Sequence, residues 1–219
     1  MEPSNFRRAA LTAAMAGAVA GGLFFSGAQL TKVGAGTPAD KVTVAGSTLT
    51  VMPPNSTATV LQASMKTSNP EDLVLQVTAE CSIVTNVTAT SNGGAATGSG
   101  EVDIQVKIDG VAVPIVSVPG QNAQKPPSAL DDGRVVFCNR VFTMTITTSG
   151  ASSDTINTYE KSKATNAFNW AAFNIGSTPS PHVITVEATF STSDPNQQAV
   201  IGNRTLIVTP TSLALNQTG

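Results

Sequence analysis

Leu73 to Val87, LVLQVTAECSIVTNV, is the stretch of the chain that decides the fold. Apolar side chains occupy every second position, namely Leu73, Leu75, Val77, Ala79, Cys81 and Ile83, and they alternate with Gln76, Thr78, Glu80 and Ser82. Because a strand repeats its side-chain direction every two residues, this pattern predicts a half-buried β-strand. Cys81 belongs to its apolar face.

The other cysteine lies in a second stretch of this kind, Arg134 to Thr148, RVVFCNRVFTMTITT. One parity is mostly apolar and carries Val136, Cys138, Phe142, Met144 and Ile146, with Arg140 interrupting it. Cys138 is therefore expected to face the core as well. For Arg140 we expect a bulge that turns it to solvent, and the alternative is a local anion site.

These two are the only cysteines of the chain. Two inward-facing cysteines in an exported protein favour a Cys81–Cys138 disulfide, because the compartment is oxidising and neither thiol has a competing partner. On the chain-entropy model the bridge would stabilise the fold by about 4 kcal/mol. A redox role would need a CxxC-like spacing, which is not present.

The remaining segments also predict β-strands, and together they indicate an all-β fold. Alternation from Val102 to Ile108 is followed by Asp109-Gly110 and a second apolar stretch, which predicts a hairpin with a type I′ turn. Strands are also expected at 184–190 and at 199–208, the latter with a bulge at Gly202, and a short helical turn at 158–165. We predict a single antiparallel β-sandwich, immunoglobulin-like or jelly-roll; the last segments resemble the closing E, F and G strands of an immunoglobulin-like or fibronectin-like sandwich.

The N-terminus has the features of an export signal. Arg7 and Arg8 precede an Ala/Gly-rich apolar run, and Ser26-Gly27-Ala28 supplies the small residues of a cleavage site. The alternatives are an uncleaved anchor and export in the folded state through the twin arginines. We expect a signal peptide at 1–28, a flexible spacer at 29–40, a β-sandwich domain at 41–210 and a polar tail at 211–219.

Composition limits the kinds of partner. Only 12% of the 219 residues are charged and the formal net charge is -2, so there is no basic surface for nucleic acid. Three polar or Gly/Pro-rich segments are expected to form loops, and they span 91–100, 117–133 and 149–166. An unknown protein or a cell-surface glycan is the expected partner, with no stable membrane span after signal cleavage.

Few residues suggest chemistry. His182 is the only histidine, and at the start of a strand it is expected to be a satisfied residue at the sandwich rim; the alternative is a general base. Asp131-Asp132 is expected to form a solvated turn before Gly133, with calcium binding together with Asp154 or Asp103 as the alternative. We expect no catalytic residue, no metal site and no cofactor.

Aromatic residues suggest one binding alternative. Trp170, with Phe168 and Phe173, is expected in the core, but an exposed Trp170 or Tyr159 would provide a stacking platform for a sugar. Trp170, Tyr159 and Arg140 are therefore the candidate ligand contacts. The Asn-x-Ser/Thr triplets at 55, 86, 203 and 216 would accept glycans only in a glycosylating host.

A family resemblance rests on four segments: KTSNPEDLVLQVTAECSI at 66–83, VVFCNR at 135–140, NAFNW at 166–170 and GNRTLIV at 202–208. They are similar to segments of uncharacterised secreted bacterial proteins. The resemblance covers roughly residues 42–210 and implies a single secreted domain from a bacterium, with no catalytic residue or ligand to transfer. We expect a non-enzymatic extracellular structural or interaction module; a carbohydrate-binding module and a hydrolase are the alternatives.

Overall fold

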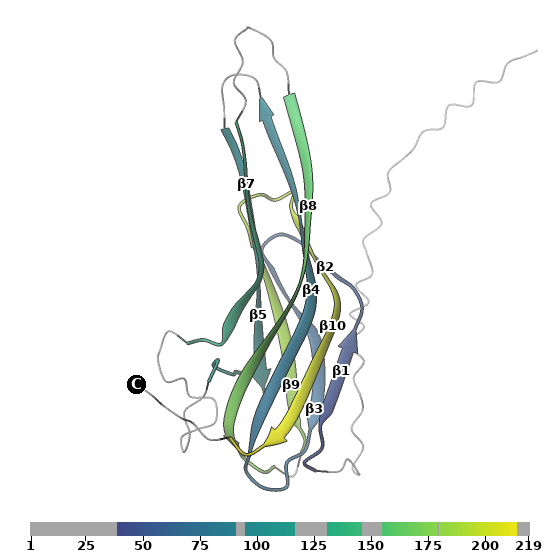
Figure 1. Cartoon of the computed structure of the whole chain (residues 1–219), viewed down its shortest axis with the longest axis vertical. Helices are drawn as coiled ribbons and strands as arrows, with labels where there is room; N and C mark the ends of the chain where they lie inside the picture. Colours follow the sequence, from purple (N-terminus) through teal and green to yellow (C-terminus); the bar gives the residue numbers. More distant parts are fainter. Residues whose placement is uncertain (1–38, 91–94, 117–130, 146–154, 179, 214–219) are drawn as a thin grey trace, which may run out of the picture.

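The computed structural model describes residues 39–90, 95–116, 131–145, 155–178 and 180–213 (Figure 1). These ranges hold ten β-strands: β1 (Thr43–Ser47), β2 (Thr50–Met52), β3 (Ser56–Met65), β4 (Glu71–Thr90), β5 (Ala95–Ile108), β6 (Val111–Ala112), β7 (Arg134–Thr145), β8 (Thr155–Ile175), β9 (His182–Thr192) and β10 (Gln198–Thr211). The predicted signal peptide, most of the spacer and most of the polar tail lie outside the described residues. In the ranges given, no helix is long and apolar enough to cross a membrane.

The strands form two antiparallel sheets packed face to face. Sheet A has the order β1-β10-β4-β8, and β2 also pairs with β10; sheet B has the order β3-β9-β5, and β5 pairs further with both β6 and β7. With β1 and β2 taken as one strand and β6 set aside, each sheet has four strands, and only β5 and β7 follow one another within the same sheet, as in a jelly roll. The prediction of an all-β antiparallel sandwich is confirmed.

The jelly-roll alternative, and not the immunoglobulin-like one, describes the strand order. In an immunoglobulin fold the last two strands lie in the same sheet. Here β9 lies in sheet B and β10 in sheet A, and β4 separates β8 from β10. The closing segments therefore do not form the E, F and G strands that they resemble in sequence, because strand alternation contains no information about which sheet each strand joins.

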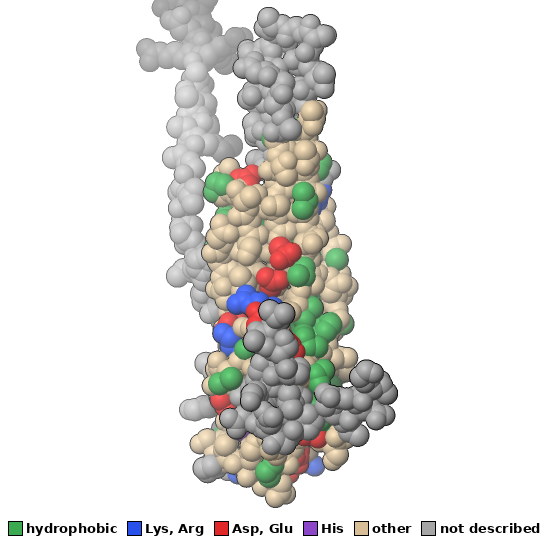
Figure 2. Space-filling view, turned by 90° about the vertical axis from the view of Figure 1, so that its left-hand side faces the viewer, with side chains coloured by type: hydrophobic (Ala, Val, Ile, Leu, Met, Phe, Trp, Pro, Cys, Tyr) green, Lys and Arg blue, Asp and Glu red, His purple; other side chains and the backbone are tan. Residues whose placement is uncertain are grey.

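The apolar parity of β4 forms the middle of the core, as predicted. All six side chains of that parity are buried, namely Leu73, Leu75, Val77, Ala79, Cys81 and Ile83. They belong to the same core cluster as the inward side chains of β9, which are Ile184, Val186, Ala188 and Phe190. The outward side chains are mostly uncharged and polar, and Figure 2 shows charged groups scattered sparsely over one side of the molecule. The faces of both central strands thus follow directly from the period of two.

Local predictions have mixed outcomes. The hairpin is confirmed: β5 ends at Ile108, β6 begins at Val111, and both turn residues have positive φ, 51° at Asp109 and 82° at Gly110, as a type I′ turn requires. The predicted helical turn at 158–165 is wrong, because these residues lie within β8. The loops predicted at 91–100 and 149–166 are both too long, since β5 begins at Ala95 and β8 begins at Thr155. In each case pairing with a neighbouring strand outweighs a weak local preference.

Arg204 connects the edge of sheet A to sheet B. The pairing of β10 with β4 shifts between Ile201 and Arg204, which confirms the bulge predicted at Gly202. The buried guanidinium donates to four carbonyl oxygens and two hydroxyl oxygens, which belong to Val60, Thr48, Ile201, Gly202, Ser47 and Thr50. Burial lowers the pKa of Arg204 from its ordinary value, and these acceptors compensate for the water that the charge has lost.

Candidate functional site

Four strands extend beyond the sandwich as a stalk. The last partner of β4 in β10 is Gln198, opposite Val84, and the last partner of β5 in β9 is Thr192, opposite Gly100. Beyond these positions only the ribbons β4–β8 and β5–β7 continue, and we call residues 85–90, 95–99, 141–145 and 155–160 the stalk (Figure 1). Thr158 Oγ1 donates to Met144 Sδ at 3.2 Å, so the two ribbons are in contact.

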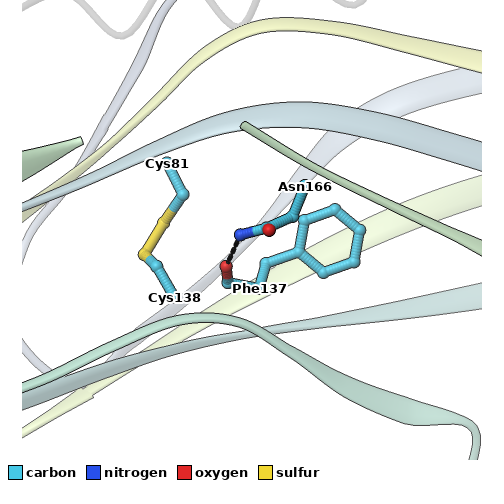
Figure 3. Close-up of a disulfide and its surroundings, with 4 residues drawn as sticks. All are labelled: Cys81, Phe137, Cys138 and Asn166. Atoms are coloured by element: carbon cyan, nitrogen blue, oxygen red, sulfur yellow. Dashed lines mark hydrogen bonds between the residues drawn. A yellow bond between two sulfur atoms is a disulfide. The ribbon is translucent and has the colours of Figure 1, made fainter. Parts of the chain in front are cut away.

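A disulfide joins the two sheets just below the stalk. Cys81 of β4 and Cys138 of β7 are bonded, as predicted, with their Cα atoms 6.1 Å apart (Figure 3). Beside the bridge, Asn166 of β8 donates through its side-chain amide to the carbonyl of Phe137, which connects the sheets a second time. Because β4 and β7 belong to different ribbons, these contacts hold the two ribbons together where they leave the sandwich.

A bulge places Cys138 on the inner face. Val102 pairs with Cys138, but Asp103 pairs with Val136, so Phe137 is the extra residue of β7. Val136 is 51% exposed and Phe137 is buried, so the prediction that Val136 faces the core is wrong. The bulge lies before Cys138 and not at Arg140. It reverses the side-chain parity from Cys138 onward, so it does not turn Arg140 outward as predicted.

Arg140 is half-buried and lies close to an aromatic ring. Its guanidinium carbon is 6.0 Å from the centroid of Phe142, within the range of a cation–π contact. Arg140 also lines a hollow of about 440 Å³ at the root of the stalk. The other lining residues are Asn55, Ser99, Gly100, Glu101, Asn139, Val141, Ser191, Thr192 and Ser193. This lining offers hydroxyls, amides and one charge of each sign, but no aromatic ring among its members.

The other two candidate ligand contacts lie apart from this hollow. Trp170 is fully buried, donates through Nε1 to the carbonyl of Gly133 at 2.8 Å, and packs edge-on against Phe168 with the centroids 5.1 Å apart. Its ring is therefore part of the core, as expected, and presents no face to a sugar. Tyr159 pairs with Asn86 in the stalk, and its side chain lies outside the described part of the structure.

His182 lies in a polar network that resembles a catalytic triad. Its Nδ1 is 2.6 Å from Asp109 Oδ2, its Nε2 is 2.7 Å from the carbonyl oxygen of Gly176, and Thr67 Oγ1 is 3.4 Å from the same Nε2. A general base needs a lone pair on Nε2 to accept the hydroxyl proton. Here Nε2 lies against the carbonyl oxygen of Gly176, and the Thr67 hydroxyl donates to that same carbonyl, so this hydroxyl is not directed at Nε2 as a nucleophile would be.

The network around His182 connects segments that are far apart in the sequence. Thr67 Oγ1 also donates to the carbonyl of Gly176 at 3.0 Å, and Asp109 Oδ1 accepts the backbone N–H of Val183 at 2.8 Å. The residues joined are distant in sequence, and both Thr67 and His182 are buried. The geometry agrees with a satisfied histidine at the rim of the sandwich; Thr67 and Asp109 carry no sequence pattern that would have identified them as its partners.

The paired acids before Gly133 organise a turn. The carboxylate of Asp131 accepts the backbone N–H groups of Ile115 and Gly133, and Asp132 accepts from Arg134 through both its backbone N–H and Nε. Gly133 has a φ of 74°, and a Cβ there would lie 1.8 Å from the carbonyl oxygen of Val113. In the part of the chain that the structure describes, which excludes Asp154, no group of three or more His, Cys, Asp or Glu could hold a metal ion.

Comparisons with known proteins leave the family open. No family model matches the chain, and no curated protein matches it. Among solved structures, one similar chain is that of the infectious bursal disease virus VP2 subviral particle, at 16% identity and a TM-score of 0.17. The match covers 79% of this chain and 42% of the viral chain, so this chain spans less than half of that protein. A TM-score this low does not identify a shared fold.

Proposed function

We propose that the protein is an exported, non-enzymatic structural or interaction module that presents the end of its stalk to a partner. The observation that carries the proposal is the stalk itself, with the disulfide and the Asn166 hydrogen bond at its root. Two of the three predicted loops, at 91–100 and 149–166, overlap the segments between the strand ends Thr90 and Ala95 and between Thr145 and Thr155. Rigid elements that carry variable connections are the usual arrangement for recognition.

Export to an oxidising compartment belongs to the same proposal. A structural disulfide in a chain with only two cysteines is typical of extracellular proteins, and the Ala/Gly-rich N-terminal run supports a signal peptide. The resemblance to uncharacterised secreted bacterial proteins supports a bacterial source. Secretion or attachment to the cell surface is the localisation that we propose.

We also propose that the protein is not an enzyme, because the buried polar side chains of His182 and Arg204 make hydrogen bonds within the fold. Nε2 of His182 faces the carbonyl of Gly176, and the guanidinium of Arg204 donates to oxygens of neighbouring strands. A hydrolase that used either residue would need it to reach a substrate instead. The carbohydrate-binding alternative loses the Trp170 platform and retains the hollow beside Arg140, which could hydrogen-bond to saccharide hydroxyls.

Two matched threonine pairs allow a direct test. Thr97 and Thr143 in the stalk have their hydroxyl oxygens 3.0 Å apart, and so do Thr57 and Thr189 in the body of the same sheet. The two residues to be substituted, Thr143 and Thr57, both have exposed side chains. We expect Thr143→Glu to weaken capture of the partner from the native cell surface at least tenfold, and Thr57→Glu to leave it unchanged. Equal capture by both variants, with unchanged thermal unfolding, would show that the stalk is not the recognition element.

A separate experiment addresses the alternatives. On a glycan array the wild-type protein is expected to give no saccharide-specific signal; a signal that Arg140→Ala removes would favour the carbohydrate-binding module. Hydrolysis of any member of a broad substrate panel, lost in a folded His182→Ala variant, would favour the hydrolase.

A further inference from the structure

The four outer edges of the two sheets differ in how they are protected against pairing with another strand. An unpaired edge exposes backbone N–H and C=O groups, and proteins usually protect it with charges, bulges, prolines or covering segments. Three edges here have such protection. The fourth, along β1 and β2, has no charged residue or proline from residue 42 to 51, although Arg204 occupies the carbonyl of Thr48 between the two strands (Figure 1).

The protected edges use different means. The sequence of β8 contains Glu160, Lys161 and Lys163, and its lower part is covered by a bridge between Ala171 and Val116. At the β3 edge the pairing shifts around Val60, whose carbonyl accepts a hydrogen bond from Arg204. The β7 edge includes Arg134 and Arg140.

The edge at residues 42–51, which we call the β1–β2 edge, is neutral and apolar. It contains no Asp, Glu, Lys, Arg or Pro. Four of its side chains are exposed large hydrophobics: Val42 at 56%, Val44 at 64%, Leu49 at 62% and Val51 at 44%. Both strands pair with β10 on one side only, and among the described residues no strand pairs with their other side.

We propose that a second copy of this chain pairs with the β1–β2 edge. Two copies of β1 placed antiparallel are related by a two-fold axis, so each copy offers the same backbone groups and the same apolar side chains to the other. Since no residue from 42 to 51 is charged, this pairing places no like charges opposite each other, which the charged β8 edge could not achieve. The result is one continuous sheet through both copies.

The length of the edge predicts the strength of the contact. β1 has five residues and β2 has three, so a pair of these edges buries much less than the about 1,600 Å² of a standard stable interface. We therefore expect weak, reversible self-association with a Kd of about micromolar or weaker, of the kind that becomes effective where a secreted protein is concentrated at a surface.

The test measures sedimentation of the full secreted chain over a range of concentrations. Wild type is expected to show a monomer–dimer equilibrium, and Val44→Lys to weaken it at least tenfold by placing a charge on each copy of the edge. Val136→Lys is the matched control, because Val136 is 51% exposed on β7 and lies away from this edge; its dimerisation should equal that of wild type.

A cross-linking experiment identifies the face. The natural cysteines are bonded to each other, so Val44→Cys adds one reactive thiol per chain. A short bis-maleimide should link two Val44→Cys chains and leave Val136→Cys chains single. A monomer at every concentration, or a dimer that Val44→Lys leaves unchanged, would overturn the inference. Neither result would affect the stalk proposal, since capture of a partner is measured separately with Thr143→Glu and Thr57→Glu.

Discussion

The roles of Arg204 and His182 in this protein follow from their hydrogen-bond partners and not from their position in the sequence. Arg204 appears in the sequence only as the basic residue of GNRTLIV, yet its guanidinium joins β10, the segment between β1 and β2, and the bulge of β3. His182 appears as a lone histidine, and only the fold brings Asp109 and Gly176 to its two nitrogens. Buried polar groups are normally hydrogen-bonded, and these two follow that rule.

Thr85 is an exception, and it leads to a prediction at this scale. Its side chain is buried at the root of the stalk, and its Oγ1 has no hydrogen-bond partner among the described residues. Because Val has the same shape without the polar atom, Thr85→Val should raise the free energy of unfolding by about 1 kcal/mol. Chemical denaturation of the two proteins measures the difference. A loss of stability would show that the hydroxyl is hydrogen-bonded in solution.

Asp103 predicts a pH dependence. Burial, with Glu101 and Asp132 nearby, raises the pKa of its carboxyl, while Arg134 acts in the opposite direction. A carboxyl with a folded-state pKa above the unfolded one destabilises the fold once it is ionised, and this cost is absent below the unfolded pKa. Asp103→Asn should therefore stabilise the protein at pH 7 by less than about 1 kcal/mol, given its partial exposure.

The same variant supplies its own control. Below pH 3.8, the ordinary value for this carboxyl, both proteins carry a neutral side chain, so their denaturation midpoints should converge. A stability difference that stays constant from pH 7 to pH 3 would mean that Asp103→Asn acts through packing and not through charge.

At the scale of elements, the two cysteine strands were predicted with different success. The alternation of β4 continues without a break through its inward residues, so every one of them was assigned to the correct face. In β7 one extra residue, Phe137, reverses the parity, so Val136 was misplaced while Cys138 was placed correctly. A bulge is stabilised by the pairing partner, here β5, and has no reliable signal within the strand that carries it.

The disulfide between these strands should stabilise both the sandwich and the root of the stalk. It closes a separation of 57 residues, so a Cys81→Ser, Cys138→Ser double variant should lose about 4 kcal/mol of unfolding free energy. Peptide mapping without reductant should recover the linked peptides from wild type, and thermal unfolding should compare the two proteins. Two free thiols in the wild-type protein purified without reductant, or equal stability of the double variant, would contradict this assignment.

At the scale of the whole molecule, the body and the stalk differ in construction. In the body, the central strands β4, β10, β5 and β9 have neighbours on both sides, and the two sheets enclose a core that includes Trp170 and Phe190. In the stalk each strand has a single neighbour, and β5 contributes only Ala, Thr, Gly and Ser there. The body and the stalk therefore share strands, but the strands have fewer neighbours in the stalk than in the body.

This difference predicts how the backbone opens. Amide hydrogens of residues 85–90 and 155–160 should exchange with solvent faster than those of residues 73–83 and 164–175 on the same two strands, because local opening is easiest where few apolar contacts are lost. Hydrogen exchange read by NMR or mass spectrometry gives both sets in one experiment. Uniform protection along β4 would show that the stalk is as stable as the body.

The sequence by itself determined the class of the fold, the inward face of β4 and β9, the Asp109-Gly110 hairpin and the Cys81–Cys138 bridge. Each of these depends on a period of two, on a local turn or on the presence of only two cysteines. The tertiary structure alone decided the jelly-roll order, the extension of four strands into a stalk, and the partners of Arg204 and His182. These features depend on which distant strands lie side by side, and the alternation within a strand is the same whichever neighbour it has.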